Sequence, residues 1–316
     1  MTDLIRLQAA RAGYRVSGRE VHAVHDVTLA IRDNEILGIA GESGCGKSTL
    51  IKLIYGQLGH PLHLFAGTAT AFIEDKPVPI AELRPHWWDF ISYIPQGSMS
   101  VLNPVLRIQD QCFDAIPPRH RARGRPALRD ALLDMFESIG LAPDVLRAYP
   151  HLLSGGMRQR VLVALAAFLH PRIMLADEPT TALDVVTQKR ILLLLRDLQR
   201  KMRNSIVIVS HDLGVHYQLT HRVAIAYAGE LVEIGPTEQL FAAPLHPYTR
   251  ALIEAIPRLG DDTRREGLEG RPPNLLEPPS GCRFHPRCPE AQDICRRMSP
   301  SLTETSPTRQ VACHFR

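Results

Sequence analysis

The chain lacks any apolar run long enough to cross a membrane as a helix. Its apolar stretches, such as residues 161–169, fall far short of the ~20 residues that a membrane span needs. Residues 1–6 also lack the basic-then-apolar layout of a secretory signal peptide. We therefore expect any link between this chain and a membrane to be made through partner proteins.

A strong excess of charge of either sign is also missing, since the formal net charge of the 316 residues is +4. Arginines gather at Arg119, Arg121, Arg123 and Arg125, but no aromatic side chains are interleaved with them. Nucleic-acid sites combine a basic patch with such stacking residues. We therefore interpret the run as a solvated loop and expect no nucleic-acid partner.

The chain does contain motifs that handle phosphate, and the first fits G-x-x-x-x-G-K-[ST] at residues 41–48. Its glycines let backbone N–H groups turn inward around phosphates, while Lys47 reaches the β and γ oxygens and Ser48 offers a hydroxyl to Mg²⁺. A strand-like run over 35–40 precedes it, and a helix over 47–58 is expected to point its dipole at the anion. The predicted phosphate-binding residues are Gly41, Ser43, Gly44, Cys45, Gly46, Lys47, Ser48 and Thr49.

An acidic pair ends a second strand-like run. Residues 172–176 read as a buried strand, and Asp177 and Glu178 follow it directly. Ligands bind at this end of the strands in open α/β sheets. We expect Asp177 to hold Mg²⁺ through water and Glu178 to orient or deprotonate the attacking water. A surface acidic pair is the alternative, and the preceding phosphate motif disfavours it.

Two further polar residues follow strand-like runs of the same kind. Gln96 comes after residues 90–94, and His211 comes after residues 205–209. We expect the Gln96 amide to contact Mg²⁺ or the lytic water and His211 to reach the γ-phosphate. Alone, neither residue would support such a role. As a set, Glu178, His211 and Gln96 are predicted to be catalytic, with Ser48, Gln96 and Asp177 around Mg²⁺.

Residues 153–160, LSGGMRQR, resemble the signature motif of the ABC ATPases, and residues 181–184, TALD, resemble their D-loop. Ser154 is suited to cap a helix over 155–169, whose free N–H groups would bind phosphate. An ordinary capped core helix is the alternative. The resemblance implies that two ATPase domains meet head to tail, with each signature helix touching the nucleotide held by the other. The residues making this trans contact would be Ser154, Gly155, Gly156 and Asp184.

The resemblance also implies an α/β fold, a P-loop ABC-type ATPase domain with a mostly parallel sheet, an N-terminal antiparallel β part and an inserted helical subdomain. Tyr14 lies where this family places an aromatic that stacks on adenine, and a packed aromatic at a strand end is the alternative. We expect the ATPase domain over residues 1–256, its helical subdomain at about 97–152 with an amphipathic helix over 127–139, and a proline-rich linker and cysteine-rich extension over 257–316.

The tail makes the resemblance more specific. The run HPYTRAL at 246–252, the run CRFHPRC at 282–288 and the run VACH at 311–314 closely resemble the C-terminal extension of the oligopeptide/dipeptide subfamily of ABC importer ATPases. This resemblance covers residues 4–314. It implies an ATP-hydrolysing subunit of a di- or oligopeptide importer that uses ATP and Mg²⁺. A nickel or oligosaccharide importer and a soluble, non-transport ABC ATPase remain open.

The implied partners are a second ABC ATPase subunit of a different chain, two transmembrane permease subunits and an extracytoplasmic solute-binding protein. The implied location is the cytoplasmic face of a bacterial inner membrane, reached through the permeases. A soluble ABC ATPase acting on DNA or the ribosome would need a long coiled-coil insertion or a second cassette, and the sequence has neither.

Four of the six cysteines, Cys282, Cys288, Cys295 and Cys313, lie in the last 35 residues. Disulfides are not expected in a reducing, ATP-containing compartment. Four thiolates suit a [4Fe–4S] cluster or tetrahedral zinc, but the spacing C-x₅-C-x₆-C lacks the paired C-x₂-C of common zinc ribbons. Some members of the resembled subfamily carry an iron–sulfur cluster here. For these four cysteines we favour a [4Fe–4S] cluster. Zinc, with His285 or His314 as a further ligand, and no metal at all are the alternatives.

Overall fold

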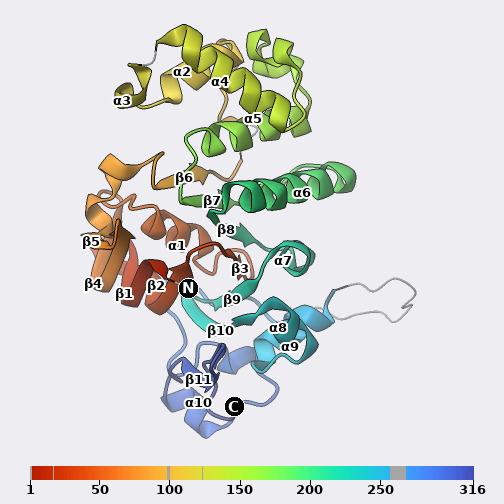
Figure 1. Ribbon diagram of the computed structural model, residues 1–316. Helices are drawn as coiled ribbons and strands as arrows, with labels where there is room; N and C mark the ends of the chain where they lie inside the picture. Colours follow the sequence, from red (N-terminus) through yellow and green to blue (C-terminus); the bar gives the residue numbers. More distant parts are fainter. Residues whose placement is uncertain (1, 17, 98–99, 123, 257–267) are drawn as a thin grey trace. The chain divides into compact units, whose positions relative to one another are not determined.

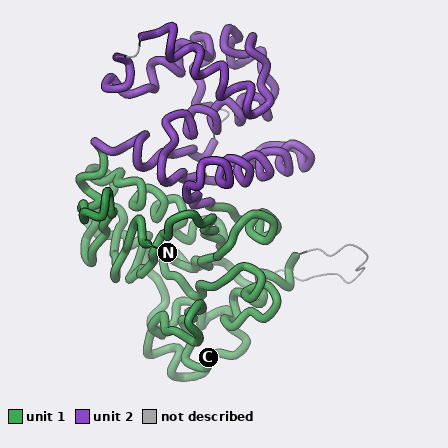
Figure 2. The backbone as a smooth tube through the Cα atoms, in the orientation of Figure 1, with its two compact units in different colours: residues 1–84, 209–316 green, residues 85–208 purple. Residues whose placement is uncertain are grey.

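The computed structural model describes residues 2–16, 18–97, 100–122, 124–256 and 268–316, which form two compact units (Figures 1 and 2). Unit 1 consists of residues 1–84 and 209–316, and unit 2 consists of residues 85–208. Unit 1 therefore joins two segments that are far apart in the sequence, whereas unit 2 is one continuous segment. Pro257, part of the expected linker, lies outside the described residues.

Unit 1 begins with an antiparallel sheet, as expected for the N-terminal part. Its order is β2-β1-β4-β5. The strands are β1 (Asp3–Val16), β2 (Arg19–Arg32), β4 (Leu62–Ile73) and β5 (Lys76–Pro79). Along β1 the side chains that face the core are apolar, such as Ile5 and Leu7, and polar residues lie between them. This alternation is typical of a sheet with one buried face.

A second set of strands in unit 1 has the order β11-β12-β10-β9-β3. These strands are β3 (Ile36–Ala40), β9 (Arg222–Tyr227), β10 (Glu230–Pro236), β11 (Thr303–Ser306) and β12 (Arg309–Val311). β3 and β9 are parallel and entirely buried, whereas the pairs β9–β10, β10–β12 and β11–β12 are antiparallel. The tail thus adds two strands to the sheet that carries the P-loop strand β3.

A buried ion pair fastens this tail to unit 1. Glu233 of β10 is fully buried, and its carboxylate lies 2.6 Å from Nη2 of Arg309 on β12. The same carboxylate accepts hydrogen bonds from the backbone N–H groups of Leu245 and His246, at 3.0 and 2.9 Å. A buried charge needs such a full set of partners. The start of the HPYTRAL segment and the strand β12 near the end of the tail therefore both bind the carboxylate of Glu233.

The helices of unit 1 lie between and beside these strands. They are α1 (Lys47–Ile54), α7 (Leu213–Leu219), α8 (Thr237–Ala242), α9 (Pro247–Glu254), α10 (Asp293–Arg297), η1 (Ile80–Glu82) and η6 (His285–Arg287). The expected helix over 47–58 ends early, at Ile54. Gly56 follows at φ 74°, a left-handed conformation that commonly ends helices. α9 begins where HPYTRAL predicted, because the Nδ1 atom of His246 accepts a hydrogen bond from the N–H of Tyr248.

Unit 2 contains the strands β6 (Ile91–Ile94), β7 (Ile173–Asp177) and most of β8 (Ser205–Ser210), in the order β8-β7-β6. β6 and β7 are parallel. Its helices are α2 (Ile108–Ala115), α3 (Pro118–Arg121), α4 (Arg125–Ser138), α5 (Gly155–Ala167), α6 (Val185–Met202), η4 (Pro143–Arg147) and η5 (Pro150–Leu152), while η2 (Arg84–His86) begins at the unit boundary. The expected α/β fold is confirmed.

The arginine run is exposed where it is described, as expected, but part of it is helical instead of a loop. Arg119 and Arg121 lie in the helix α3, and Arg119 pairs with Asp89 at 2.5 Å. Arg123 lies outside the described residues. Among the helices described in both units, none combines the length and the hydropathy required to span a membrane.

A buried histidine lies beside the P-loop strand. His216 of α7 is fully buried, and its ring leaves no room for a side chain at Gly38 of β3, where an added Cβ would lie 2.4 Å from Nδ1. Its Nε2 atom lies 3.1 Å from the carbonyl oxygen of Ser210. Burial disfavours the charged ring and lowers the pKa of His216 to about 4. His216 is therefore neutral in the folded protein.

We predict that His216 makes the protein less stable in mild acid. The unfolded chain binds a proton below its ordinary pKa of 6.5 and the folded chain does not, so stability is lost as the pH falls from about 6.5 toward about 4. From about pH 7.5 to about pH 5 this histidine should cost about 2 kcal/mol of unfolding free energy. Denaturant unfolding across this range measures the slope.

The variant His216→Gln keeps a donor for Ser210 but cannot bind the proton, so its slope should be smaller. His246 is also buried and its pKa is lowered to about 3, so some slope will remain. The exposed His170 supplies the matched control, and His170→Asn should leave the slope unchanged. An equal slope in wild type and His216→Gln would contradict the prediction.

Candidate functional site

The predicted phosphate loop in unit 1 lies between β3 and α1. Gly46 ends it at φ 103°, and an added Cβ there would lie 2.0 Å from the carbonyl oxygen of Ala23. As a glycine, it provides no side chain to cap α1. The first N–H groups of α1 thus have no capping side chain, and such a helix end is a ready anion site. Ser43 and Gly44 are exposed at the tip of the loop.

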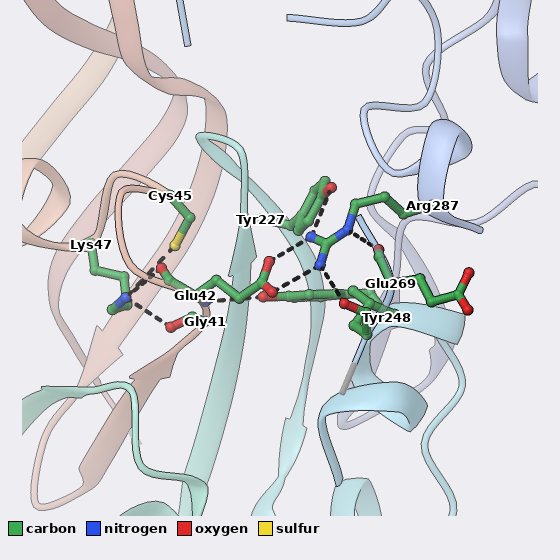
Figure 3. Close-up of polar contacts among 9 residues, drawn as sticks. Gly41, Glu42, Cys45, Lys47, Tyr227, Tyr248, Glu269 and Arg287 are labelled. Carbon is green, nitrogen blue, oxygen red and sulfur yellow. Dashed lines mark hydrogen bonds and ion pairs between the residues drawn. The ribbon is translucent and has the colours of Figure 1, made fainter. Parts of the chain in front are cut away.

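Lys47 brings a positive charge into this loop. Its side chain is buried, with a residue exposure of 6%, and its ammonium donates hydrogen bonds to the carbonyls of Gly41 and Glu42 at 2.8 Å each (Figure 3). The sulfur of Cys45 lies 3.9 Å away. These partners are neutral, so they solvate the charge without cancelling it. A phosphate would supply the missing negative charge.

Tyr14 and His211 are the other predicted site residues in unit 1. The Tyr14 hydroxyl lies 3.1 Å from Oγ1 of Thr49, which ties this β1 side chain to α1. His211 is exposed directly after β8. The next residue, Asp212, caps α7 by accepting a hydrogen bond from the N–H of Gly214 at 2.8 Å. Stacking of Tyr14 on adenine and contact of His211 with a γ-phosphate stay predictions.

Unit 2 brings the two carboxylates and the glutamine together. Asp177 ends β7 and is buried, and its Oδ2 accepts a hydrogen bond from the Tyr93 hydroxyl at 3.2 Å. Glu178 follows at φ 48°, a conformation that non-glycine residues adopt mainly under constraint. Its Oε2 accepts hydrogen bonds from Nε2 of Gln96 at 3.4 Å and from the Thr181 hydroxyl at 3.0 Å. Each carboxylate is thus oriented by neutral donors.

Sequence reasoning assigned no role to Tyr93 or to the Thr181 hydroxyl. Tyr93 looks like any residue of the strand β6, and its contact with Asp177 follows from the parallel pairing of β6 with β7. Thr181 lies in the D-loop-like segment, three residues beyond Glu178. That spacing is the signal that would have suggested a contact between them.

The signature segment starts α5 as expected, since Oγ of Ser154 accepts a hydrogen bond from the N–H of Met157 at 3.3 Å. An added Cβ at Gly156 would lie 2.6 Å from Cγ2 of Thr187. The N–H of Thr187 in turn donates to Oδ1 of Asp184, the residue that caps α6, at 2.9 Å. The signature segment therefore packs on the first turn of α6, which Asp184 caps, and both Ser154 and Asp184 face solvent.

The four tail cysteines line one small cavity in unit 1, together with His285 and His314. All six cysteines of the chain are free. Burial, followed by lesser effects that include the neighbouring thiols Cys288 and Cys295, raises the pKa of Cys282 to about 11. Within the described part of the chain, no three His, Cys, Asp or Glu side chains have an arrangement that could hold a metal ion as they stand. The four thiols share a site, but their side chains do not converge on one point.

Cys45 stands apart from this cavity, inside the phosphate loop. Its side chain is buried, and burial raises the pKa of its thiol. A buried, protonated thiol reacts slowly because the thiolate is the nucleophile. The predicted place of Cys45 among the phosphate-binding residues stays a prediction.

Two family models match the chain. The model described as "ABC transporter" matches residues 24–181, and the model described as "Oligopeptide/dipeptide transporter, C-terminal region" matches residues 232–295. The first contains the P-loop, Gln96, the signature segment, Asp177 and Glu178. The second contains α9 and three of the four tail cysteines. The two matches therefore cover most of the motifs identified in the sequence.

The chain is similar over its whole length to transport proteins. It is 38% identical to the dipeptide transport ATP-binding protein of Caldanaerobacter subterraneus, over 100% of this chain and 98% of that protein. It is 36% identical to the oligopeptide transport ATP-binding protein of Salmonella typhimurium, over 98% of this chain and 93% of that protein.

A solved structure shares the fold. It is a dimeric ATP-binding cassette in a post-hydrolysis state with ADP and phosphate, and it matches with a TM-score of 0.60 and 26% identity over 74% of this chain and 98% of that one. The chain therefore belongs to the ATP-hydrolysing subunits of the ABC transporter family.

Proposed function

We propose that this ABC ATPase powers a binding-protein-dependent importer of di- or oligopeptides. The observation that carries the proposal is the match of residues 232–295 to the oligopeptide/dipeptide transporter region, in a chain whose residues 24–181 match the ABC ATPase. The named relatives transport dipeptides and oligopeptides, which supports the same class of solute here. Nickel and oligosaccharides remain alternative solutes, because the solute is selected by other subunits.

We propose that residues of the predicted motifs bind ATP. In unit 1, Lys47 and the uncapped N-terminus of α1 bind the phosphates, Ser43, Gly44 and Thr49 complete the loop, and Tyr14 stacks on adenine. Mg²⁺, when bound, would neutralise charge on the phosphates, and Ser48, Gln96 and Asp177 are the residues proposed to hold it. The Tyr93 hydroxyl keeps the Asp177 carboxylate in one orientation for this task.

Hydrolysis is proposed to use Glu178 as the base. A water oxygen attacks the γ-phosphorus while the bond to the β–γ bridging oxygen breaks, giving ADP and phosphate, and the water's proton passes to the Glu178 carboxylate. Hydrogen bonds from Gln96 and Thr181 fix that carboxylate in advance. His211 is proposed to contact the γ-phosphate. Catalysis of this kind depends on positioning and on charge stabilisation.

We infer that the ATPase acts as a head-to-tail dimer in which Ser154, Gly155, Gly156 and Asp184 contact the partner's nucleotide. Apolar side chains beside these residues support an interface, since Val185 is 80% and Leu152 is 66% exposed. The similar cassette structure is dimeric. The second ATPase is proposed to be a different, related chain, and a second copy of this chain is the alternative.

The segment 101–106 is the proposed docking site for the permeases. It has three partly exposed apolar side chains, of which Val105 is exposed the most, at 76%. Exposed apolar side chains that form a patch are typical of protein interfaces. Two permease subunits would bind the ATPase pair here and hold it at the cytoplasmic face of the inner membrane, and an extracytoplasmic binding protein would deliver the solute.

We expect Glu178→Gln to lower the kcat of ATP hydrolysis by about 100-fold or more, because the base is lost, and to leave ATP affinity almost unchanged. Lys47→Ala should instead weaken ATP binding. Steady-state hydrolysis and equilibrium ATP binding separate the two effects. The matched control is Glu304→Gln on the exposed strand β11. A Glu178→Gln enzyme that keeps more than about a tenth of the wild-type rate would refute the role of Glu178.

Affinity purification tests the importer. The tagged chain, purified from gently solubilised membranes of its host, should bring down two polytopic permeases and a second ABC ATPase, and the binding protein that follows should bind peptides. Val105→Glu should reduce recovery of the permeases, and Glu304→Gln should not. Recovery of soluble proteins alone would contradict transport, while a nickel- or sugar-binding protein would contradict the peptide solute.

We also propose that the cysteine cavity holds a [4Fe–4S] cluster, with zinc as the alternative. The supporting observation is that Cys282, Cys288, Cys295 and Cys313 line one cavity, which gives the four thiolates such a cluster requires. The side chains would have to turn toward a common centre when the group binds. Its proposed role is to stabilise the small extension, which has little core of its own.

Protein purified without oxygen should contain about four iron atoms and acid-labile sulfide per chain. Cys288→Ser should lose them, and Cys112→Ser in α2 should keep them. If the protein contains zinc and no acid-labile sulfide, the cluster is refuted and the site is a zinc site. Absence of both elements from freshly purified wild type would exclude a metal centre.

A further inference from the structure

The cysteine-rich tail reaches into the phosphate loop through one arginine. Arg287 ends η6, a single turn between the cavity residues Cys282 and Cys288. Its guanidinium holds both carboxylate oxygens of Glu42, with Nη1 at 2.6 Å from Oε2 and Nη2 at 3.0 Å from Oε1 (Figure 3). The Arg287 side chain is only 6% exposed and that of Glu42 is 24% exposed. The pair is therefore bidentate and largely shielded from water.

Other contacts leave the guanidinium little freedom. Its Nε donates a hydrogen bond to the carbonyl of Glu269 at 2.9 Å, and Nη1 lies 3.4 Å from the Tyr227 hydroxyl. The Tyr227 ring lies 5.8 Å from the guanidinium carbon. A charged fork fixed on several sides is a precise holder for a carboxylate. The position of Glu42 is thus set by η6.

Glu42 belongs to the phosphate loop and connects three parts of unit 1. Its side chain pairs with Arg287, and its N–H donates to the hydroxyl of the fully buried Tyr248 in α9 at 3.0 Å. Its carbonyl accepts from the ammonium of Lys47 at 2.8 Å. A movement of Glu42 would therefore displace a carbonyl that holds the Lys47 ammonium, which is proposed to bind phosphate.

Glu42 also poses an electrostatic problem. A carboxylate inside an anion-binding loop repels a triphosphate, and poor access of water makes the repulsion stronger. Arg287 cancels this charge at hydrogen-bonding distance. The tail therefore supplies a positive charge that pairs with this carboxylate, in addition to the Lys47 ammonium of the loop.

We propose that Arg287 is a positioning residue for ATP binding: it neutralises Glu42 and holds the first turn of the phosphate loop, so that the cysteine-rich tail sets the affinity for ATP. The proposal rests on the ATPase function proposed above. It adds a contribution from the tail, which lies outside the residues matched by the ABC transporter model.

The proposal predicts a specific pattern in a double-mutant cycle. Arg287→Met should raise the Kd and KM for ATP by about tenfold, because the Glu42 charge is left uncompensated, while kcat changes by less than about twofold. Glu42→Gln should have a small effect. The double variant should bind ATP within about threefold of wild type, because the repelling charge is gone. Higher salt should reduce the defect of Arg287→Met by screening.

Equilibrium ATP binding and steady-state hydrolysis by the purified full chain measure these values. Arg250→Met is the matched control, since Arg250 of α9 pairs with Glu290 of the same tail at 2.8 Å. Its Kd should stay within about twofold of wild type. Thermal unfolding checks that each variant is folded. If Arg287→Met is not folded, Arg287→Gln tests the same point, because it removes the charge and keeps hydrogen-bond donors.

Two results would overturn the proposal. One is an ATP affinity of Arg287→Met equal to that of Arg250→Met. The other is a double variant that binds no better than Arg287→Met, which would mean that the arginine acts through folding alone. A wild-type chain that binds no ATP would instead refute the proposed function, so the two failures are distinguishable.

Discussion

The buried ammonium of Lys47 is the constraint around which unit 1 is arranged. A cation removed from water is costly unless polar groups surround it, and here the carbonyls of Gly41 and Glu42 fill that role. To present those carbonyls the loop must bend tightly, which requires glycine at position 46 against Ala23. The loop is then fixed between a wholly buried strand, β3, and a helix without a capping side chain. Carbonyls do not cancel the charge, so the loop is built to accept an anion.

Unit 2 contains the two predicted site carboxylates, and these are held in a different way. Asp177 and Glu178 follow one buried strand, and hydroxyl and amide groups from Tyr93, Gln96 and Thr181 hold them. These hydrogen bonds restrict the orientation of each carboxylate. The residues predicted to bind phosphate thus lie in unit 1, and the two predicted acids lie in unit 2.

Much of this could be predicted from the sequence because phosphate chemistry demands particular residues at fixed spacings. The strands β3, β7 and β8 were predicted within about one residue, since fully buried strands are continuous apolar runs. Helix ends were less predictable: α1 ends at Ile54 because Gly56 turns left-handed, and α5 ends at Ala167 instead of Leu169. The pair Arg287–Glu42 had no signal at all, because 245 residues separate its members and neither lies in a repeating pattern. The roles of the individual site residues stay predictions.

The discontinuous make-up of unit 1 has a consequence for how the protein is made. Unit 2 is one uninterrupted segment, so its residues are all available to fold while the ribosome is still adding the tail. Unit 1 needs residues from both its segments, including Arg309 for the pair with Glu233 and Arg287 for the pair with Glu42. During synthesis the phosphate loop is made early, and Arg287, the partner of its Glu42, is made more than 240 residues later. A nascent chain that lacks residues 287–309 thus exposes an incomplete phosphate loop, and synthesis of these residues is the step that makes the two ion pairs of unit 1 possible.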